Sequence, residues 1–279
     1  RAEGLATAEA PKAEYQIRTT GSGGNQLDML RELELPEEYL PELIDHCEEP
    51  SLSRGGVAHE GWVASRLGLR GQPAAAEESM VARDILLAEL TGGHVHIAHV
   101  STAGAVEMIR AAKDKGLSVT AEVTPHHLTL THDWVAGERS NLFPGLQPPP
   151  LRDGERAGEE VGYPYDTNTK VNPPLRTNDD VDAVVDGLAD GTIDMIATDH
   201  APHAATDKEC TYQEAAHGIS NIETAFGSCM VPVHDGALSL EDLIERMTAA
   251  PARFLGPIAG GTGLGSLKPG LPADVVVLD

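Results

Sequence analysis

Residues 191–203 read GTIDMIATDHAPH, a short apolar strand followed at once by acidic and imidazole side chains. The run at 193–197 carries Ile, Met, Ile and Ala without regular polar alternation, which predicts a strand buried on both faces. Asp199, His200 and His203 follow the end of this strand. Because catalytic groups gather at the C-terminal ends of parallel strands, we expect Asp199 at such a rim. A helix cap beside two surface histidines is the alternative for this loop taken alone.

Three other short strands are expected, and each leads to histidine. They comprise residues 43–45 before His46, residues 94–100 with His99 near their end, and residues 118–123 before His126 and His127. Helices are expected at residues 74–90, 103–115, 179–188 and 240–249, with Asn178 as the cap of the third. A repeated βα pattern with polar residues at the strand ends predicts a (β/α) barrel, or part of one.

Parts of the chain outside this pattern carry weaker signals. Residues 55–73 are expected to form a long surface loop, and residues 132–169, rich in glycine, proline and charge, an insertion at the strand rim. The head, residues 1–42, holds no histidine and has an atypical sequence. Residues 43–265 are therefore the expected catalytic region, and residues 266–279 are expected to form a turn and a final strand.

Composition narrows the class of protein. A formal net charge of −24, from 44 acidic and 20 basic residues, repels nucleic acids and anionic lipids. No apolar run is long enough for a membrane span or a signal peptide, so a cytoplasmic protein is expected. The three cysteines, Cys47, Cys210 and Cys229, show no paired spacing, so we expect reduced thiols.

Imidazoles and a carboxylate that converge without cysteine suit zinc or a similar divalent ion. Such an ion makes bound water acidic near neutral pH, and a carboxylate beside it can carry a proton to a leaving group. Asp199 is the candidate for that proton transfer. The residues alone therefore predict metal-assisted hydrolysis at a carbonyl, with the substrate class open.

Six segments carry a family resemblance: HCEE at 46–49, HEG at 59–61, HVHIAHVST at 94–102, VTAEVTPHHLTLT at 119–131, NPPLR at 172–176 and GTIDMIATDHAPH at 191–203. Together they closely resemble the bacterial-type dihydroorotases of the amidohydrolase superfamily. Hydantoinases and allantoinases share the strand-end histidines, but TPHHL, NPPLR and ATDHAPH together resemble dihydroorotase. The resemblance implies an α/β fold, the second half (strands 5 to 8) of a (β/α)8 TIM barrel, with residues 266–279 starting the return to a small β-sandwich domain.

The resemblance also implies residue roles and a reaction. His46 and His99 match metal-binding histidines, Asp199 matches a metal ligand and proton shuttle, and zinc, as one or two ions, is the implied cofactor. The positions that match substrate contacts are Asn172, His203, which suits a free carboxylate, and Gly218. The implied reaction is the reversible hydrolysis of the cyclic amide of dihydroorotate to N-carbamoyl-L-aspartate in pyrimidine biosynthesis.

The remaining histidines have simpler interpretations. His126 and His127 are expected to pack near or support the site, His94 and His96 to lie in the core or form hydrogen bonds, and His59, His132 and His234 to take surface or local packing positions.

Segments that the family carries are missing from residues 1–42. These are an HxH pair followed by an arginine, and a bridging lysine or aspartate, and their loss counts against activity of this chain alone. An open half-barrel would be covered by self-association, by a partner chain or by a part of the enzyme outside this sequence. The alternatives are a non-catalytic dihydroorotase-like subunit that supports aspartate transcarbamoylase, and a hydantoinase or dihydropyrimidinase type of enzyme.

Overall fold

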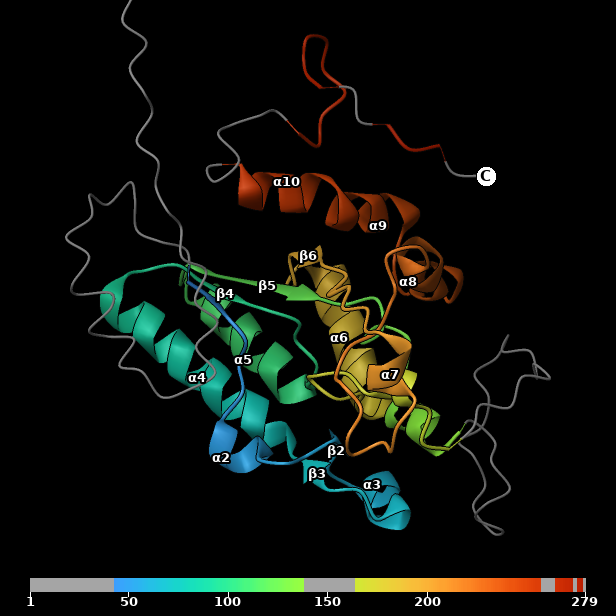
Figure 1. The fold of residues 1–279 in the computed structure, drawn as a ribbon. Helices are drawn as coiled ribbons and strands as arrows, with labels where there is room; N and C mark the ends of the chain where they lie inside the picture. The colour runs from blue at the N-terminus through green and yellow to red at the C-terminus, as the bar shows by residue number, and fades with distance from the viewer. Residues whose placement is uncertain (1–42, 138–163, 257–263, 273–274, 278–279) are drawn as a thin grey trace, which may run out of the picture.

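The computed structural model describes residues 43–137, 164–256, 264–272 and 275–277. Within these residues a four-stranded parallel sheet has the order β1 (Leu43–Asp45), β4 (Val95–Ile97), β5 (Val119–Val123) and β6 (Met195–Ile196). The strands follow one another in the sheet in sequence order (Figure 1). The predicted parallel βα pattern is therefore confirmed, and the carboxyl ends of the four strands lie at one end of the sheet.

Three long helices connect these strands and lie side by side (Figure 1): α4 (Ala74–Thr91), α5 (Ala103–Asp114) and α6 (Asn178–Asp190). α4 and α6 end at Gly92 and Gly191, whose φ angles of 71° and 85° suit a residue without a side chain. The predicted cap Asn178 is wrong by one residue. The side chain of Thr177 caps α6 instead, in a reciprocal hydrogen-bonded arrangement with Asp180. Threonine and asparagine can both serve as helix caps, which explains the difference of one residue.

The main core lies between the sheet and these helices. β4 is buried at all three positions, and Ile97 belongs to one cluster with Ile109 of α5 and Leu188 of α6. The other face of the sheet is covered by helices from the C-terminal part of the chain. There the ring of His96 packs on Phe254, with 4.4 Å between the ring centroids. Burial on both faces explains why β6, which is buried at both of its positions, lacks polar alternation.

Truncating the centre of this core by one methyl group gives the first test. Ile97→Val is expected to lower the free energy of unfolding by about 1 kcal/mol, because a cavity replaces a fully buried methyl group. Urea unfolding followed by circular dichroism measures the change. Leu86→Ala, at a position 63% exposed on α4, is the control and should change it by less than about 0.5 kcal/mol.

The expectation of a long surface loop at residues 55–73 is wrong. This segment contains α3 (Trp62–Leu67) and a two-stranded parallel sheet of β2 (Ala58–His59) and β3 (Gly71–Gln72), and it follows the short helix α2 (Pro50–Ser53). A second buried cluster forms here from Val57, Val63, Leu67, Leu69 and Tyr212, among others. A Cβ at Gly71 would lie 2.6 Å from the Cα of Glu60, so the glycine that suggested a loop permits close strand packing.

The C-terminal part is helical, with α7 (Ala205–Lys208), α8 (Ala225–His234), α9 (Leu240–Met247) and α10 (Ala249–Leu255). The predicted helix at 240–249 therefore ends two residues early, and Thr248 separates α9 from α10. Residues 275–277 do not form the predicted final strand. None of the helices in the described ranges is long and apolar enough to cross a membrane.

The predicted insertion at 132–169 is described only at its ends, which form the short 3-10 helices η2 (His132–Ala136) and η3 (Thr167–Thr169). Its middle lies outside the described residues, as does the head at 1–42. The domain limits at 43–265 and 266–279 stay predictions.

Candidate active site at the strand ends

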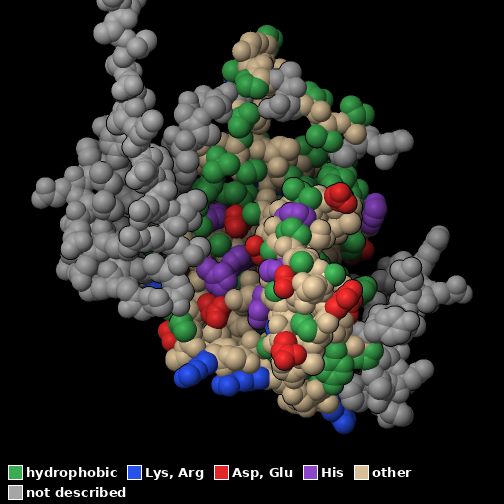
Figure 2. All heavy atoms as spheres, viewed as in Figure 1, with side chains coloured by type: hydrophobic (Ala, Val, Ile, Leu, Met, Phe, Trp, Pro, Cys, Tyr) green, Lys and Arg blue, Asp and Glu red, His purple; other side chains and the backbone are tan. Residues whose placement is uncertain are grey.

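The candidate site lies where the four strands end. His46 follows β1 directly, His99 comes two residues after β4, His126 three residues after β5 and Asp199 three residues after β6. Because the strands are parallel, these positions share one rim of the sheet. Figure 2 shows histidine side chains gathered in the middle of one face, with acidic groups close to them.

His46 and His99 are in direct contact. Their ring centroids are 4.4 Å apart and the rings meet edge to face at 78°. Burial, followed by the nearby His46, lowers the pKa of His99 to about 3, so this imidazole is neutral at physiological pH. Its Nδ1 atom is buried and has no hydrogen-bond partner among the described residues. Such an orphaned nitrogen is costly, and it suits a ligand that binds there.

Two non-glycine residues at the rim have left-handed backbones. The φ angle is 36° at His99 and 46° at Asp199, a region that costs L-residues about 1–2 kcal/mol each. The loop of Asp199 is held by Asn221, whose amide donates to the carbonyl of Thr198 at 2.6 Å. Conformations of this kind persist only where the surroundings hold them, and they cluster at functional sites.

Asp199 is exposed at the rim, but the partial burial of its carboxyl group raises the pKa of that group. The nearby His46 acts in the opposite direction and Glu122 in the same direction, so Asp199 lies within electrostatic range of His46. The ligand atoms of His46, His99 and Asp199 do not all lie within 4.8 Å of one another. Among the described residues, the group that meets this distance is Asp45, Cys47 and Asp84.

The carboxylates of Asp45 and Asp84 are already paired with the guanidinium group of Arg83. The Nη2 atom of Arg83 lies 3.0 Å from Asp45 Oδ2 and 2.7 Å from Asp84 Oδ1. Burial and the adjacent Asp45 raise the pKa of Asp84 to about 7, and burial raises that of the Cys47 thiol well above its usual value. We therefore interpret the group as a partly buried ion pair that involves the residues flanking His46 in the sequence. Sequence reasoning missed it, although Asp84 stands seven residues after Glu77 on the buried face of α4.

Asn172 lies beside the imidazole ring of His46. Its Nδ2 donates to Glu48 Oε2 at 2.6 Å and lies 3.4 Å from His46 Nε2, while Gln72 Nε2 donates to its Oδ1 at 3.2 Å. An open cavity of about 470 Å³ is bounded by Glu48, Gln72, Lys170, Asn172 and His217, among others. The predicted substrate residue Asn172 is thus placed between a cavity and His46.

The other two predicted substrate residues lie together on neighbouring loops. His203 Nε2 donates to the carbonyl of His217 at 2.8 Å, and a Cβ at Gly218 would come within 3.0 Å of the same nitrogen. Both backbone groups of Gly218 are engaged, its N–H with Lys170 O at 2.9 Å and its carbonyl with Lys208 Nζ at 2.6 Å. A substrate contact at Gly218 would therefore use the second lone pair of its carbonyl oxygen.

Gly218 gives a second test. Its φ angle is 141°, and an added Cβ would lie 2.5 Å from the carbonyl oxygen of Ala201. Gly218→Ala is therefore expected to displace the loop of His203 and to cost about 1–2 kcal/mol of folding free energy. Thermal unfolding measures the cost, and Gly227→Ala, at a helical position with open space around it, should stabilise the protein or leave it unchanged.

The interpretation of the supporting histidines is confirmed in part. His94 Nε2 and His96 Nδ1 both hydrogen-bond to the hydroxyl of Thr120, at 2.9 and 2.8 Å, as expected for core or hydrogen-bonded residues. His126 and His127 are buried with their rings 4.5 Å apart, and His127 Nε2 donates to the carbonyl of Pro173 at 3.0 Å. Their support of a bound metal stays a prediction.

Comparisons with known proteins give matches to two family models and to curated dihydroorotases. The dihydro-orotase-like family profile matches residues 38–105, and the NeuB family profile matches residues 1–54. The dihydroorotase of Pelotomaculum thermopropionicum is 50% identical over 238 residues, which cover 85% of this chain and 48% of that protein. The dihydroorotase of Syntrophus aciditrophicus is 45% identical over 255 residues, 91% of this chain and 52% of that protein. This chain belongs to the dihydroorotase family. It spans about half the length of the curated relatives it matches.

Solved structures related to the dihydroorotase family confirm the fold. L-hydantoinase (dihydropyrimidinase) from Arthrobacter aurescens superposes with a TM-score of 0.61 at 27% identity, over 82% of this chain and 46% of that chain. Dihydropyrimidinase from Brevibacillus agri gives 0.61 at 20% identity, with the same coverage. The parallel α/β sheet of this chain therefore has the fold of part of a TIM barrel, as the sequence predicted.

Proposed function

We propose that this chain supplies the metal-binding and proton-transfer part of a zinc-dependent dihydroorotase. The reaction is the reversible hydrolysis of dihydroorotate to N-carbamoyl-L-aspartate. The observation that carries the proposal is the contact between His46 and a neutral His99 with an unpartnered Nδ1, beside Asp199. The identity of 45–50% to curated dihydroorotases supports this substrate over other cyclic amides.

The residues at the rim fit a zinc ion. His46 and His99 offer imidazole nitrogens and Asp199 a carboxylate oxygen, which are the donor types that zinc takes, and the unpartnered Nδ1 of the neutral His99 is available. A divalent ion there would make water acidic near neutral pH and would polarise the ring carbonyl. The ion count, one or two, depends on ligands from outside the described residues.

Asp199 would move the proton of the reaction. Water adds to the ring carbonyl carbon, the ring C–N bond breaks, and the proton that Asp199 takes from water passes to the leaving nitrogen. The raised pKa of this carboxyl group suits both steps, because it brings the group closer to the working pH. Asn172 and His203 would orient the substrate, with the imidazole of His203 toward its free carboxylate.

Zinc content and turnover test the proposal together. The purified chain should contain about one or two zinc ions by mass spectrometry, and dihydroorotate should be hydrolysed by the chain or by its complex with the rest of the barrel. Zinc with turnover supports the enzyme. No zinc and no turnover, with a stable complex with aspartate transcarbamoylase, would instead support the non-catalytic subunit.

A hydantoinase-type specificity is the second candidate. The 27% identity to an L-hydantoinase favours it, and the assay separates the two when hydantoin and dihydrouracil are offered beside dihydroorotate. A higher kcat/KM for dihydroorotate is expected.

The ends of the sheet favour association with another chain. Among the described residues, β1 pairs with β4 alone and β6 with β5 alone, so each leaves one strand edge without a strand partner. We propose that a second copy, or a chain that carries the rest of the barrel, covers them. The mass in solution, measured by light scattering, tests this association.

A further inference from the structure

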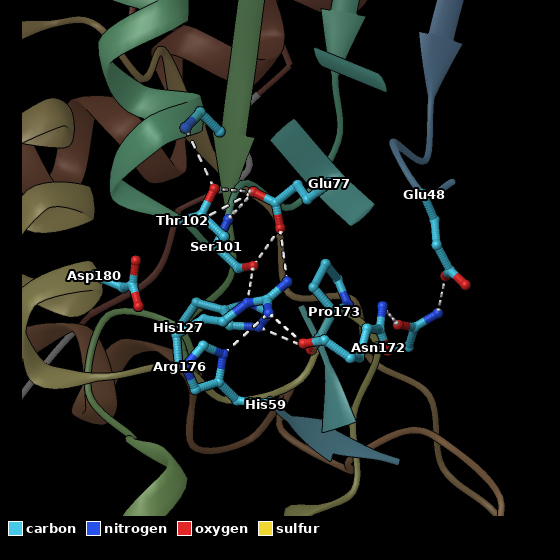
Figure 3. Close-up of polar contacts among 12 residues, drawn as sticks. Glu48, His59, Glu77, Ser101, Thr102, His127, Asn172, Pro173, Arg176 and Asp180 are labelled. Atoms are coloured by element: carbon cyan, nitrogen blue, oxygen red, sulfur yellow. Dashed lines mark hydrogen bonds and ion pairs between the residues drawn. The ribbon is translucent and has the colours of Figure 1, made fainter. Parts of the chain in front are cut away.

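A buried ion pair lies behind the rim, between α4 and the segment that follows Asn172. The side chains of Glu77 and Arg176 are 4% and 1% exposed, and Arg176 Nη2 approaches Glu77 Oε2 to 3.5 Å. The metal-binding and substrate roles proposed above involve neither residue. Figure 3 shows that both lie at the centre of a polar network that also contains Ser101, Thr102 and Asn172.

Glu77 holds the segment that follows His99. Its Oε1 accepts the backbone N–H groups of Ser101 at 2.9 Å and Thr102 at 3.1 Å, together with the Thr102 hydroxyl at 3.1 Å, and its Oε2 accepts the Ser101 hydroxyl. A single carboxylate therefore fixes the two residues that come two and three positions after His99. On the other side, Asp180 of α6 accepts the next N–H group, that of Ala103, at 3.0 Å.

Arg176 joins this segment to the one that carries Asn172. Its Nε donates to the Ser101 hydroxyl at 3.0 Å, and its Nη1 donates to the carbonyl of Gln72 at 3.1 Å and to His59 Nδ1 at 3.2 Å. Gln72 in turn donates its side-chain amide to Asn172 at 3.2 Å. One guanidinium group thus sets the distance between the His99 segment, β3 and the segment of Asn172.

The position of this network next to His99 has a physical explanation. His99 has a φ angle of 36°, a conformation that its surroundings must hold. Two residues later the chain reaches Ser101, whose backbone N–H group donates to Glu77. A buried ion pair is a poor way to gain stability, because its desolvation offsets most of its attraction and apolar residues often serve as well. What it supplies is a fixed geometry with five directed donors.

We propose that Arg176 and Glu77 are positioning residues, which hold His99 and Asn172 at the spacing that the metal and substrate need. The metal and substrate parts rest on the proposed function. The fixed geometry of residues 98–103 does not, and it can be tested on its own.

The decisive variant is Arg176→Lys, which keeps the buried charge but cannot reach Ser101, Gln72 and His59 together. Zinc should dissociate about tenfold more readily, as for other residues that orient metal ligands. The absorption spectrum of the cobalt-substituted full chain should also change, and amide hydrogen exchange at residues 98–103 should accelerate. The matched control is Arg110→Lys, at an exposed pair with Asp190 that also uses Nε and Nη2, and it should change none of the three.

A second variant removes the two charges together. Glu77→Gln/Arg176→Met leaves no lone buried charge, so the melting temperature should stay near that of the wild type while zinc affinity still falls about tenfold. Unchanged zinc affinity, cobalt spectrum and hydrogen exchange in folded variants would overturn the inference. If the wild type binds no zinc, the proposed function fails, and exchange at residues 98–103 alone then decides whether the pair positions His99.

Discussion

Replacing Asp199 by asparagine is expected to lower the turnover number for dihydroorotate by about 10²- to 10⁴-fold, the contribution of a positioned general acid–base group. Asparagine has nearly the same shape and keeps one oxygen donor, but it cannot take up a proton from water or return it to the leaving nitrogen. Since partial burial of the carboxyl group raises the pKa of Asp199, this group is better suited to the exchange than an aspartate with an ordinary pKa.

The measurement is kcat, in a preparation that hydrolyses dihydroorotate, with zinc content determined on the same sample. Asp186→Asn on the exposed side of α6 makes the same chemical change away from the rim and should leave kcat unchanged. An Asp199→Asn variant with full zinc content and wild-type kcat would show that another group moves the proton. Such a result would leave the family assignment intact, because that assignment rests on sequence identity.

The strand-end residues could be predicted from the sequence because the residues just before each of them mark the end of a strand. A short apolar run followed by His46, or by Asp199, marks the end of a buried strand, and parallel connections then bring these ends to one rim. The contact of His46 with His99 follows from the pairing of β1 with β4, which the order of the elements indicates. The backbone conformation at Asp199 does not follow, because its φ angle of 46° is encoded by no sequence pattern.

The buried charges could not be predicted in the same way. Glu77 and Asp84 look like ordinary surface residues of an acidic helix, and only the seven-residue spacing shared with the apolar face indicates otherwise. Arg176, the partner of Glu77, is 99 residues away in the sequence, and Asp45, which shares Arg83 with Asp84, is 39 residues from Asp84. Both arrangements are therefore properties of the tertiary fold. Gly71 misled for a related reason, because glycine marks close backbone packing as well as loops.

Lowering the pH from 7 to 5 is expected to destabilise the protein strongly. Burial lowers the pKa of His126 to about 4 and that of His127 well below its usual range. Both imidazoles are therefore neutral in the folded state, whereas in the unfolded chain they bind a proton below about pH 6.5. Between about pH 4 and pH 6.5 the unfolded state binds more protons than the folded state. The stability that the neutral rings contribute is therefore fully present above about pH 6.5 and is lost as the pH falls toward the folded-state pKa values.

For His126 alone this linkage amounts to about 2 kcal/mol at pH 5, and His127 adds a loss of the same sign. Against a total stability of about 5–15 kcal/mol for a typical domain, the loss is large enough to place acid unfolding within a readily measured range. Urea unfolding at pH 7, 6 and 5 measures it. His126→Gln should flatten the pH dependence, whereas His234→Gln, at an exposed position on α8, should not. Because the raised pKa of Asp84 acts in the opposite direction over this range, the comparison of His126→Gln with the wild type decides the question. A His126→Gln variant that keeps the wild-type pH dependence would mean that the His126 ring is hydrated, which would contradict the closed packing behind the rim.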